Sequence, residues 1–141
     1  MSDPKSSAFQ EWNPAPKRPV GTDLAARLMD DMDPEVLEFL KTSVNSFIKW
    51  DLVIFYSENP NTTDTATNVS RYIGRDLSVT ESEMDELVQS KVLQRDRVSD
   101  LTVYSLTIDQ AMRDRIKHFV AVANDVQFRG KVFYHLIRGL R

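Results

Sequence analysis

Cysteine is absent from the sequence, so neither a disulfide bond nor a thiolate metal site can form. Disulfide bonds are typical of secreted proteins, and a chain without them fits the reducing cytoplasm. Apolar runs are also short, and none approaches the roughly 18 residues that a membrane-spanning helix needs. The N-terminal segment has no apolar signal-peptide core. We therefore expect a cytoplasmic protein without a membrane partner.

Glycine and histidine are scarce, which excludes most catalytic motifs. Four glycines leave no phosphate-cradling loop, and no nucleophile elbow, zinc-protease or P-loop pattern occurs. The two histidines, His118 and His135, are 17 residues apart on one expected helix and cannot share a local metal site. The acidic run of Asp30, Asp31 and Asp33 lacks the spacing of a calcium loop. We predict that the protein is not an enzyme and needs no metal or organic cofactor.

Charge is unevenly placed along the chain, although the formal net charge is only −3. Residues 22–93 hold 14 acids and 6 bases, whereas residues 111–141 hold 2 acids and 7 bases. A net charge this small gives no overall basic field that would attract nucleic acid. An anionic partner is therefore expected at the C-terminal end, unless the basic end pairs with the acidic body in the same chain or in a dimer mate.

Proline is concentrated near the N-terminus, where four of the six prolines fall within residues 1–21. This segment has no apolar period and predicts a flexible tail. A single domain is expected to follow over residues 22–141. Its first helix is predicted at 22–33, because apolar residues recur there at helical spacing.

A longer apolar stretch predicts a central helix over about 34–58. Asp33 can cap this helix and Pro34 suits its first position, while an interruption is expected near Ser43–Ser46. Another helix is expected within residues 62–74, where Gly74 is placed as the stop.

Residues 79–93 predict the next helix, in which Thr80 and Glu83 would form a capping box. Apolar residues continue at helical spacing to about Leu93. The segment that follows alternates as a two-stranded hairpin does, with its tip near 98–100.

This order of elements resembles the winged helix-turn-helix superfamily. FIKWDLVIFYSENP, residues 47–60, looks like its first helix, and TATNVSRYIGRDLSVTESEMDELVQSKVLQR, residues 65–95, is similar to its commonest bacterial pattern. The expected fold is mainly α with a small β-hairpin wing: a winged helix-turn-helix core at 47–107, extra N-terminal helices and a long C-terminal helix. The turn before the wing usually carries a small residue, often Gly-Leu, and this sequence has Lys91 there instead.

The resemblance implies a small bacterial-type transcription regulator or DNA-associated protein. In DNA-binding members the third helix enters the major groove, and the wing touches the backbone or the minor groove. By position, the candidate DNA-binding residues are Arg71, Arg75, Thr80, Ser82, Gln89, Arg95 and Arg97.

The same helix carries four acids where a DNA-binding helix would face phosphates: Glu81, Glu83, Asp85 and Glu86. Carboxylates beside phosphates oppose binding unless cations flank them. The alternative function is therefore a winged-helix protein–protein interaction module, whose acidic third helix docks a partner without DNA binding. A stand-alone structural adaptor is a third interpretation.

Residues 109–141 predict a helical arm whose apolar residues hold one phase for more than 25 residues. A continuous helix of that length would reach about 45 Å, longer than a small domain is wide. Either the helix breaks near 124–130 and folds back, or another chain covers its apolar stripes. We expect a homodimer held by this arm. The candidate interface residues are Phe119, Val126, Phe133, Leu136 and Ile137.

Overall fold

The computed structural model describes residues 32–138 of the chain. The chain divides into two units, Met1–Met32 and Asp33–Arg141, and every described helix and strand belongs to the second unit. The tail predicted at 1–21 therefore lies outside the described residues, as does nearly all of the helix predicted at 22–33.

Helices make up most of the second unit. Its described residues contain six helices together with a three-stranded antiparallel sheet, in which the strand order is β1-β3-β2. The helices are α2 (Pro34–Thr42), α3 (Phe47–Glu58), α4 (Ala66–Ile73), α5 (Leu77–Gln89), α6 (Gln110–Ala123) and α7 (Val126–Ile137). The strands are β1 (Thr63–Asp64), β2 (Leu93–Val98) and β3 (Leu101–Leu106). The predicted class, mainly α with a small β-hairpin, is confirmed at this level.

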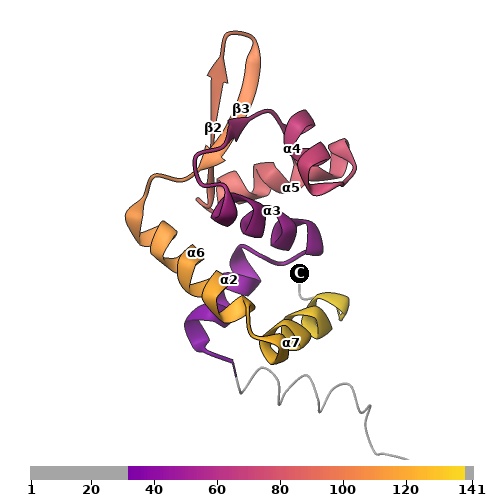
Figure 1. Cartoon of the computed structure of the whole chain (residues 1–141), viewed down its shortest axis with the longest axis vertical. Coiled ribbons are helices and arrows are strands. Elements are labelled where there is room, and N and C mark those ends of the chain that lie inside the picture. The colour runs from indigo at the N-terminus through magenta and orange to yellow at the C-terminus, as the bar shows by residue number, and fades with distance from the viewer. Residues whose placement is uncertain (1–31, 139–141) are drawn as a thin grey trace, which may run out of the picture. The chain divides into compact units, whose positions relative to one another are not determined.

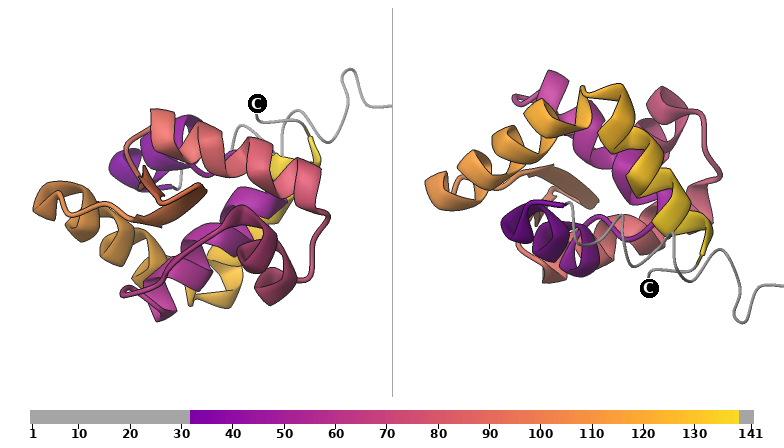
Figure 2. Two further views of the ribbon diagram at one scale, coloured as in Figure 1. Left: turned by 90° about the horizontal axis from the view of Figure 1, so that it is seen from above. Right: turned by 90° about the horizontal axis from the view of Figure 1, so that it is seen from below.

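Helix α3 lies at the centre of the unit, and it packs against α4, α5 and α6. The β2–β3 hairpin extends away from the helices, as Figure 1 shows. Three residues of α3, Leu52, Val53 and Tyr56, are fully buried. The Tyr56 hydroxyl donates a hydrogen bond to the Tyr104 carbonyl at 3.3 Å, which links α3 to β3. Seen from below, α7 lies over α3 (Figure 2).

The interruption predicted near Ser43–Ser46 is confirmed, because this segment separates α2 from α3. Asp33 caps α2, as predicted, and its carboxylate accepts a hydrogen bond from the Glu35 backbone N–H at 2.9 Å. Ser46 caps α3 in the same way, by accepting a bond from the Lys49 backbone N–H at 3.1 Å. Each helix therefore has its own start signal in the sequence.

Helix α5 begins at Leu77, two residues before the predicted range 79–93 and about one turn before the start that a Thr80 cap would give. Its cap is Asp76, whose carboxylate accepts a hydrogen bond from the Val79 backbone N–H at 3.3 Å. The predicted capping box of Thr80 and Glu83 is therefore wrong, since both residues lie inside the helix and are buried.

Two helices are followed by a residue in the left-handed conformation that favours glycine. Gly74, the predicted stop of α4, has a φ of 71°, and Lys91, after α5, has a φ of 74°. The Lys91 backbone N–H donates to the Val88 carbonyl at 3.1 Å, and the Val92 N–H donates to the Leu87 carbonyl at 2.9 Å. These two bonds form a Schellman motif. The turn after α5 therefore has the backbone conformation that favours glycine, although Lys91 occupies that position.

The long C-terminal helix is broken, which confirms the first of the two predicted alternatives. Asp125 caps α7 by accepting a hydrogen bond from the Phe128 backbone N–H at 2.8 Å. Helix α7 then folds back on α3, so that the Phe133 ring lies 5.5 Å from the ring of Phe47. Val132, on the same turn, is fully buried.

Phe119 on α6 joins the helices in an aromatic core. Its ring centroid lies 5.3 Å from that of Phe39 on α2 and 5.5 Å from that of Trp50 on α3. It also lies 6.2 Å from the ring of Phe128 on α7. All three pairs are edge-to-face, the arrangement that suits the charge distribution of aromatic rings.

Candidate binding face of α5 and the hairpin

The candidate site is the face where α5, the start of α4 and the β2–β3 hairpin meet, and a shallow groove lies there. Its lining residues are Thr65, Ala66, Thr67, Leu77, Glu81, Asp100, Leu101, Thr102 and Tyr104. Two of them are carboxylates, two are exposed leucines, and none is basic. The groove therefore combines negative charge with apolar surface.

Asp85 on α5 is compensated within the chain. Its carboxylate accepts hydrogen bonds from the Arg95 guanidinium and from the Tyr104 hydroxyl, each at 2.7 Å. Arg95 and Tyr104 lie opposite one another on β2 and β3, so both reach the same oxygen from one face of the hairpin. Burial, followed by the hydrogen bond to Asp85, raises the pKa of Tyr104 to about 12. Asp85 fastens the hairpin to α5.

Glu83 and Glu86 turn toward α3. The Ser46 hydroxyl donates a hydrogen bond to Glu83, and the Lys49 ammonium pairs with Glu86. Lys49 is buried, lies 4.0 Å from the Glu83 carboxylate and donates a further bond to the Asn45 side chain at 2.8 Å. Two of the four acids predicted to face outward are thus held against the neighbouring helix, and the outward side of α5 is less acidic than its sequence indicates.

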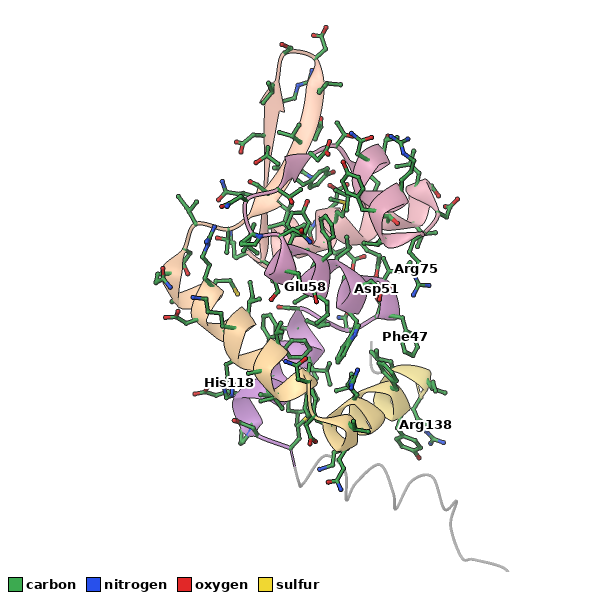
Figure 3. The ribbon with its side chains drawn as sticks, viewed as in Figure 1. Phe47, Asp51, Glu58, Arg75, His118 and Arg138 are labelled. Atoms are coloured by element: carbon green, nitrogen blue, oxygen red, sulfur yellow. The ribbon has the colours of Figure 1, made fainter. Side chains whose placement is uncertain are left out.

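The arginines of this face are also partly compensated. Arg75 forms an ion pair with Asp51 on α3, at 2.7 Å between guanidinium and carboxylate (Figure 3). Arg95 pairs with Asp85, as described above. Arg71 is exposed and donates a hydrogen bond to the Asn68 side chain. Of the four candidate arginines, two are engaged by carboxylates.

The remaining candidate DNA-binding residues divide into buried and exposed ones. Thr80 is 0% exposed, and its hydroxyl has no hydrogen-bond partner in the described residues, so its outward placement is wrong. Ser82 and Gln89 on α5 and Arg97 on β2 are exposed. Together with Arg71, these three side chains are the part of the predicted DNA-binding set that is exposed and not held in an ion pair described above, whereas Arg75 and Arg95 are exposed but paired with carboxylates.

The candidate dimer residues also differ in their exposure to solvent. Phe119 is 1% exposed and packs inside the chain's own core, so it is not available to a second chain. Val126 and Ile137 are each 73% exposed, Phe133 is partly exposed, and Leu136 is half-buried. The candidate dimer residues that remain available to a second chain therefore all lie on α7.

Sequence patterns missed four exposed apolar residues of α5 and the hairpin, of which Leu77 and Leu101 line the groove. Leu77, Val79, Val98 and Leu101 are all exposed, from 41% at Leu77 to 57% at Leu101. Asp76, as a cap directly before Leu77, is the signal that could have revealed the first two. The two hairpin residues pair with each other next to the turn, which the alternation alone did not single out.

A second hollow, of about 150 Å³, lies between α2 and α6. Val36, Phe39 and Phe119 form its apolar part, and the Arg115 guanidinium lies 5.3 Å above the Phe39 ring. Nearby, the His118 ring contacts the Asp33 carboxylate at 3.2 Å. The hydrogen bonds from the Glu35 backbone and from His118 lower the pKa of Asp33.

Among residues 32–138, no group of three or more His, Asp or Glu side chains is arranged to hold a metal ion. None of the described helices is long and apolar enough to cross a membrane. Comparison of the chain with protein-family models, with curated proteins and with solved structures finds no match.

Proposed function

We propose that residues 47–107 form a winged helix whose α5–hairpin face binds a protein partner. The element order α3, β1, α4, α5, β2, β3, with β1 paired to β3, supports the winged-helix assignment. Fold alone is a weak guide to function. The choice of a protein partner rests on the chemistry of the groove.

The composition of the groove carries this proposal. Nucleic-acid binding requires cations placed against phosphates, and the groove between α5 and the hairpin is lined by Glu81 and Asp100 without a basic residue. Two of the candidate arginines, Arg75 and Arg95, are engaged by Asp51 and Asp85. The internal pairing also explains the acidic sequence of α5, because most of its carboxylates stabilise the fold.

The partner segment that suits this groove is basic and apolar. Leu77 and Leu101 offer apolar contact from both sides of the groove, and exposed apolar groups rimmed by polar ones mark protein contacts. Glu81 and Asp100 would pair with lysine or arginine side chains at the edge. We therefore expect a peptide segment in which a basic residue flanks a large aliphatic or aromatic one.

Selection from a random peptide library displayed on phage tests this function. Wild-type protein should enrich peptides with a basic residue beside a large apolar one, and Glu81→Lys and Leu101→Ser should each abolish their binding. Glu38→Lys, the same charge change on the exposed surface of α2, is the matched control and should leave binding intact. Failure to enrich any peptide, or equal binding by Glu81→Lys and Glu38→Lys, would contradict the proposal.

DNA association is the second candidate function. The exposed side chains of Ser82 and Gln89 on α5, Arg71 on α4 and Arg97 on β2 favour it, since polar and basic groups can contact bases and phosphates. Fluorescence anisotropy with random and genomic duplexes, at about 50 and 150 mM salt, separates the two functions. Nanomolar, sequence-specific binding at the higher salt that is lost in Arg71→Ala/Arg97→Ala would favour DNA. Absent or purely non-specific binding would favour the protein partner.

A further inference from the structure

Helix α7 carries a largely exposed apolar stripe, within which the Phe133 ring packs 5.5 Å from the ring of Phe47 and 5.4 Å from that of Trp50. Val126, Gly130, Phe133 and Ile137 fall on one side of the helix at positions i, i+4, i+7 and i+11. Val126, Gly130 and Ile137 are exposed and Phe133 is partly exposed. The opposite side of α7 holds the buried residues Phe128 and Val132, which anchor the helix to the rest of the unit.

Gly130 lies near the middle of this stripe, where glycine weakens a helix relative to alanine. A Cβ atom at this position would meet no atom within 4 Å. Its φ is not among the positive values of the described residues. Neither packing nor backbone conformation within the protomer therefore requires a glycine. A missing side chain on an exposed apolar stripe does allow the backbone of another helix, or a large ring, to approach closely.

The stripe is symmetric about the midpoint between Lys131 and Val132. Val126 and Ile137 lie equally far from that point on either side, and so do Gly130 and Phe133. A two-fold axis through this point pairs each residue with its counterpart on a second, antiparallel α7. Val126 then faces Ile137 of the second copy, and the large Phe133 ring faces the space left by Gly130.

The charges at the two ends of the helix fit the same arrangement. Asp125 stands just before α7 and Arg138 stands just after it. These two residues are also equally far from the midpoint, so an antiparallel pair places Asp125 of one copy at the same end of the helix pair as Arg138 of the other. A parallel pair would instead bring like charges together at each end. Charge complementarity therefore selects the antiparallel orientation.

We propose that a second copy of this chain docks on α7, with the two α7 helices antiparallel and the exposed edge of each Phe133 ring against Gly130 of the other copy, while its other side stays packed on Phe47 and Trp50. This surface is separate from the α5–hairpin groove and does not depend on the proposed function. One helix pair covers less area than the ~800 Å² per partner of a standard interface, so the dissociation constant should lie in the micromolar range.

Gly130→Leu tests the contact without a folding ambiguity. The monomer has room for the new side chain and gains helix propensity, so its melting temperature should hold or rise. The leucine occupies the place of the partner's Phe133 ring and should weaken dimerisation by about tenfold or more. Sedimentation equilibrium at micromolar protein concentrations measures the proportions of monomer and dimer, and the monomer has a mass of 16.2 kDa. Ala121→Leu, which adds the same side chain on the exposed surface of α6, is the control and should dimerise like wild type.

Orientation is tested by cysteine cross-linking, which is clean because the chain contains no cysteine. An equal mixture of Val126→Cys and Ile137→Cys should form a mixed disulfide much faster than either variant forms a disulfide with itself. Equal or faster self-coupling of Val126→Cys would overturn the antiparallel arrangement. A wild-type monomer at every concentration, or a dimer that Gly130→Leu leaves unchanged, would overturn the proposal as a whole.

Discussion

Asp85 on α5 and Arg95 on β2 form an ion pair with 2.7 Å between guanidinium and carboxylate, although they are ten residues apart in the chain. The same carboxylate oxygen also accepts the hydrogen bond of the Tyr104 hydroxyl. A residue predicted to oppose DNA and a residue predicted to attract it thus neutralise each other. The consequence is structural: α5 and the hairpin hold one relative position.

We predict that Asp85→Ala destabilises the fold more than Arg95→Ala does. Arg95→Ala removes one exposed ion pair, which contributes little to the free energy of unfolding. Asp85→Ala also leaves the partly buried Tyr104 hydroxyl without its acceptor, which adds about 1–2 kcal/mol. Urea denaturation of both variants measures the difference in the free energy of unfolding. A larger loss for Arg95→Ala would show that the carboxylate is not the organising group.

Lys91→Gly should stabilise the protein. Lys91 has a φ of 74°, a conformation that costs a residue with a Cβ about 1–2 kcal/mol. Part of that gain is offset by the larger entropy of glycine in the unfolded chain, so we expect a net gain of about 0.5–1 kcal/mol. Thermal unfolding measures this gain. Lys91→Ala is the control, because it removes the same side chain and keeps the strain; equal melting temperatures for the two variants would refute the explanation.

Stability should fall in alkaline solution through Tyr104. The pKa of Tyr104 is raised to about 12 in the folded chain, so its contribution is complete below the ordinary pKa of about 10. It is lost as the pH rises from about 10 toward 12, because the unfolded chain gives up the phenol proton more readily. Tyr104→Phe should flatten this part of the stability profile. Urea midpoints at several pH values above neutrality measure it, and a profile identical to wild type would exclude Tyr104 as the source.

Lys49→Ala should be strongly destabilising. Lys49 is buried and its ammonium pairs with Glu86 and lies 4.0 Å from the buried Glu83 carboxylate. Removal of a buried cation from such a group costs about 3–5 kcal/mol. Lys41→Ala, on the exposed end of α2, is the matched control and should change the free energy of unfolding little. Similar unfolding midpoints for the two variants would show that the buried network contributes no net stability.

Local signals predicted the element boundaries well where a cap or stop residue stood alone. Three predicted boundaries are of this kind: the cap Asp33, the break near Ser43–Ser46 and the stop Gly74. Each depends on hydrogen bonds to backbone groups a few residues away, so the sequence alone reveals it. The start of α5 was misplaced because Asp76 and Thr80 both suit a helix cap. In the structure Asp76 is the cap and Thr80 is buried inside the helix, and periodicity over one helix does not reveal that burial.

The candidate site was harder to predict, since its electrostatics depend on contacts between distant residues. Lys49 and Glu86 are 37 residues apart, and Arg75 and Asp51 are 24 apart. Sequence alone does not show which charged side chain pairs with which, so each charge on a helix surface is predicted to be unpaired. The outward face was therefore predicted as more acidic and more basic than it is, and the apolar contribution of Leu77 and Leu101 was overlooked.

The aromatic core around Phe119 has a consequence for cooperativity. The rings of α2, α3, α6 and α7 meet on one side chain, so the stretch 47–107 cannot bury Trp50 without the helices that follow it. A chain ended at the hairpin would expose these rings and should not fold alone. The described residues are thus expected to melt in a single transition, and a ligand bound at the groove, far from α7 in the sequence, should raise the melting temperature of every element together.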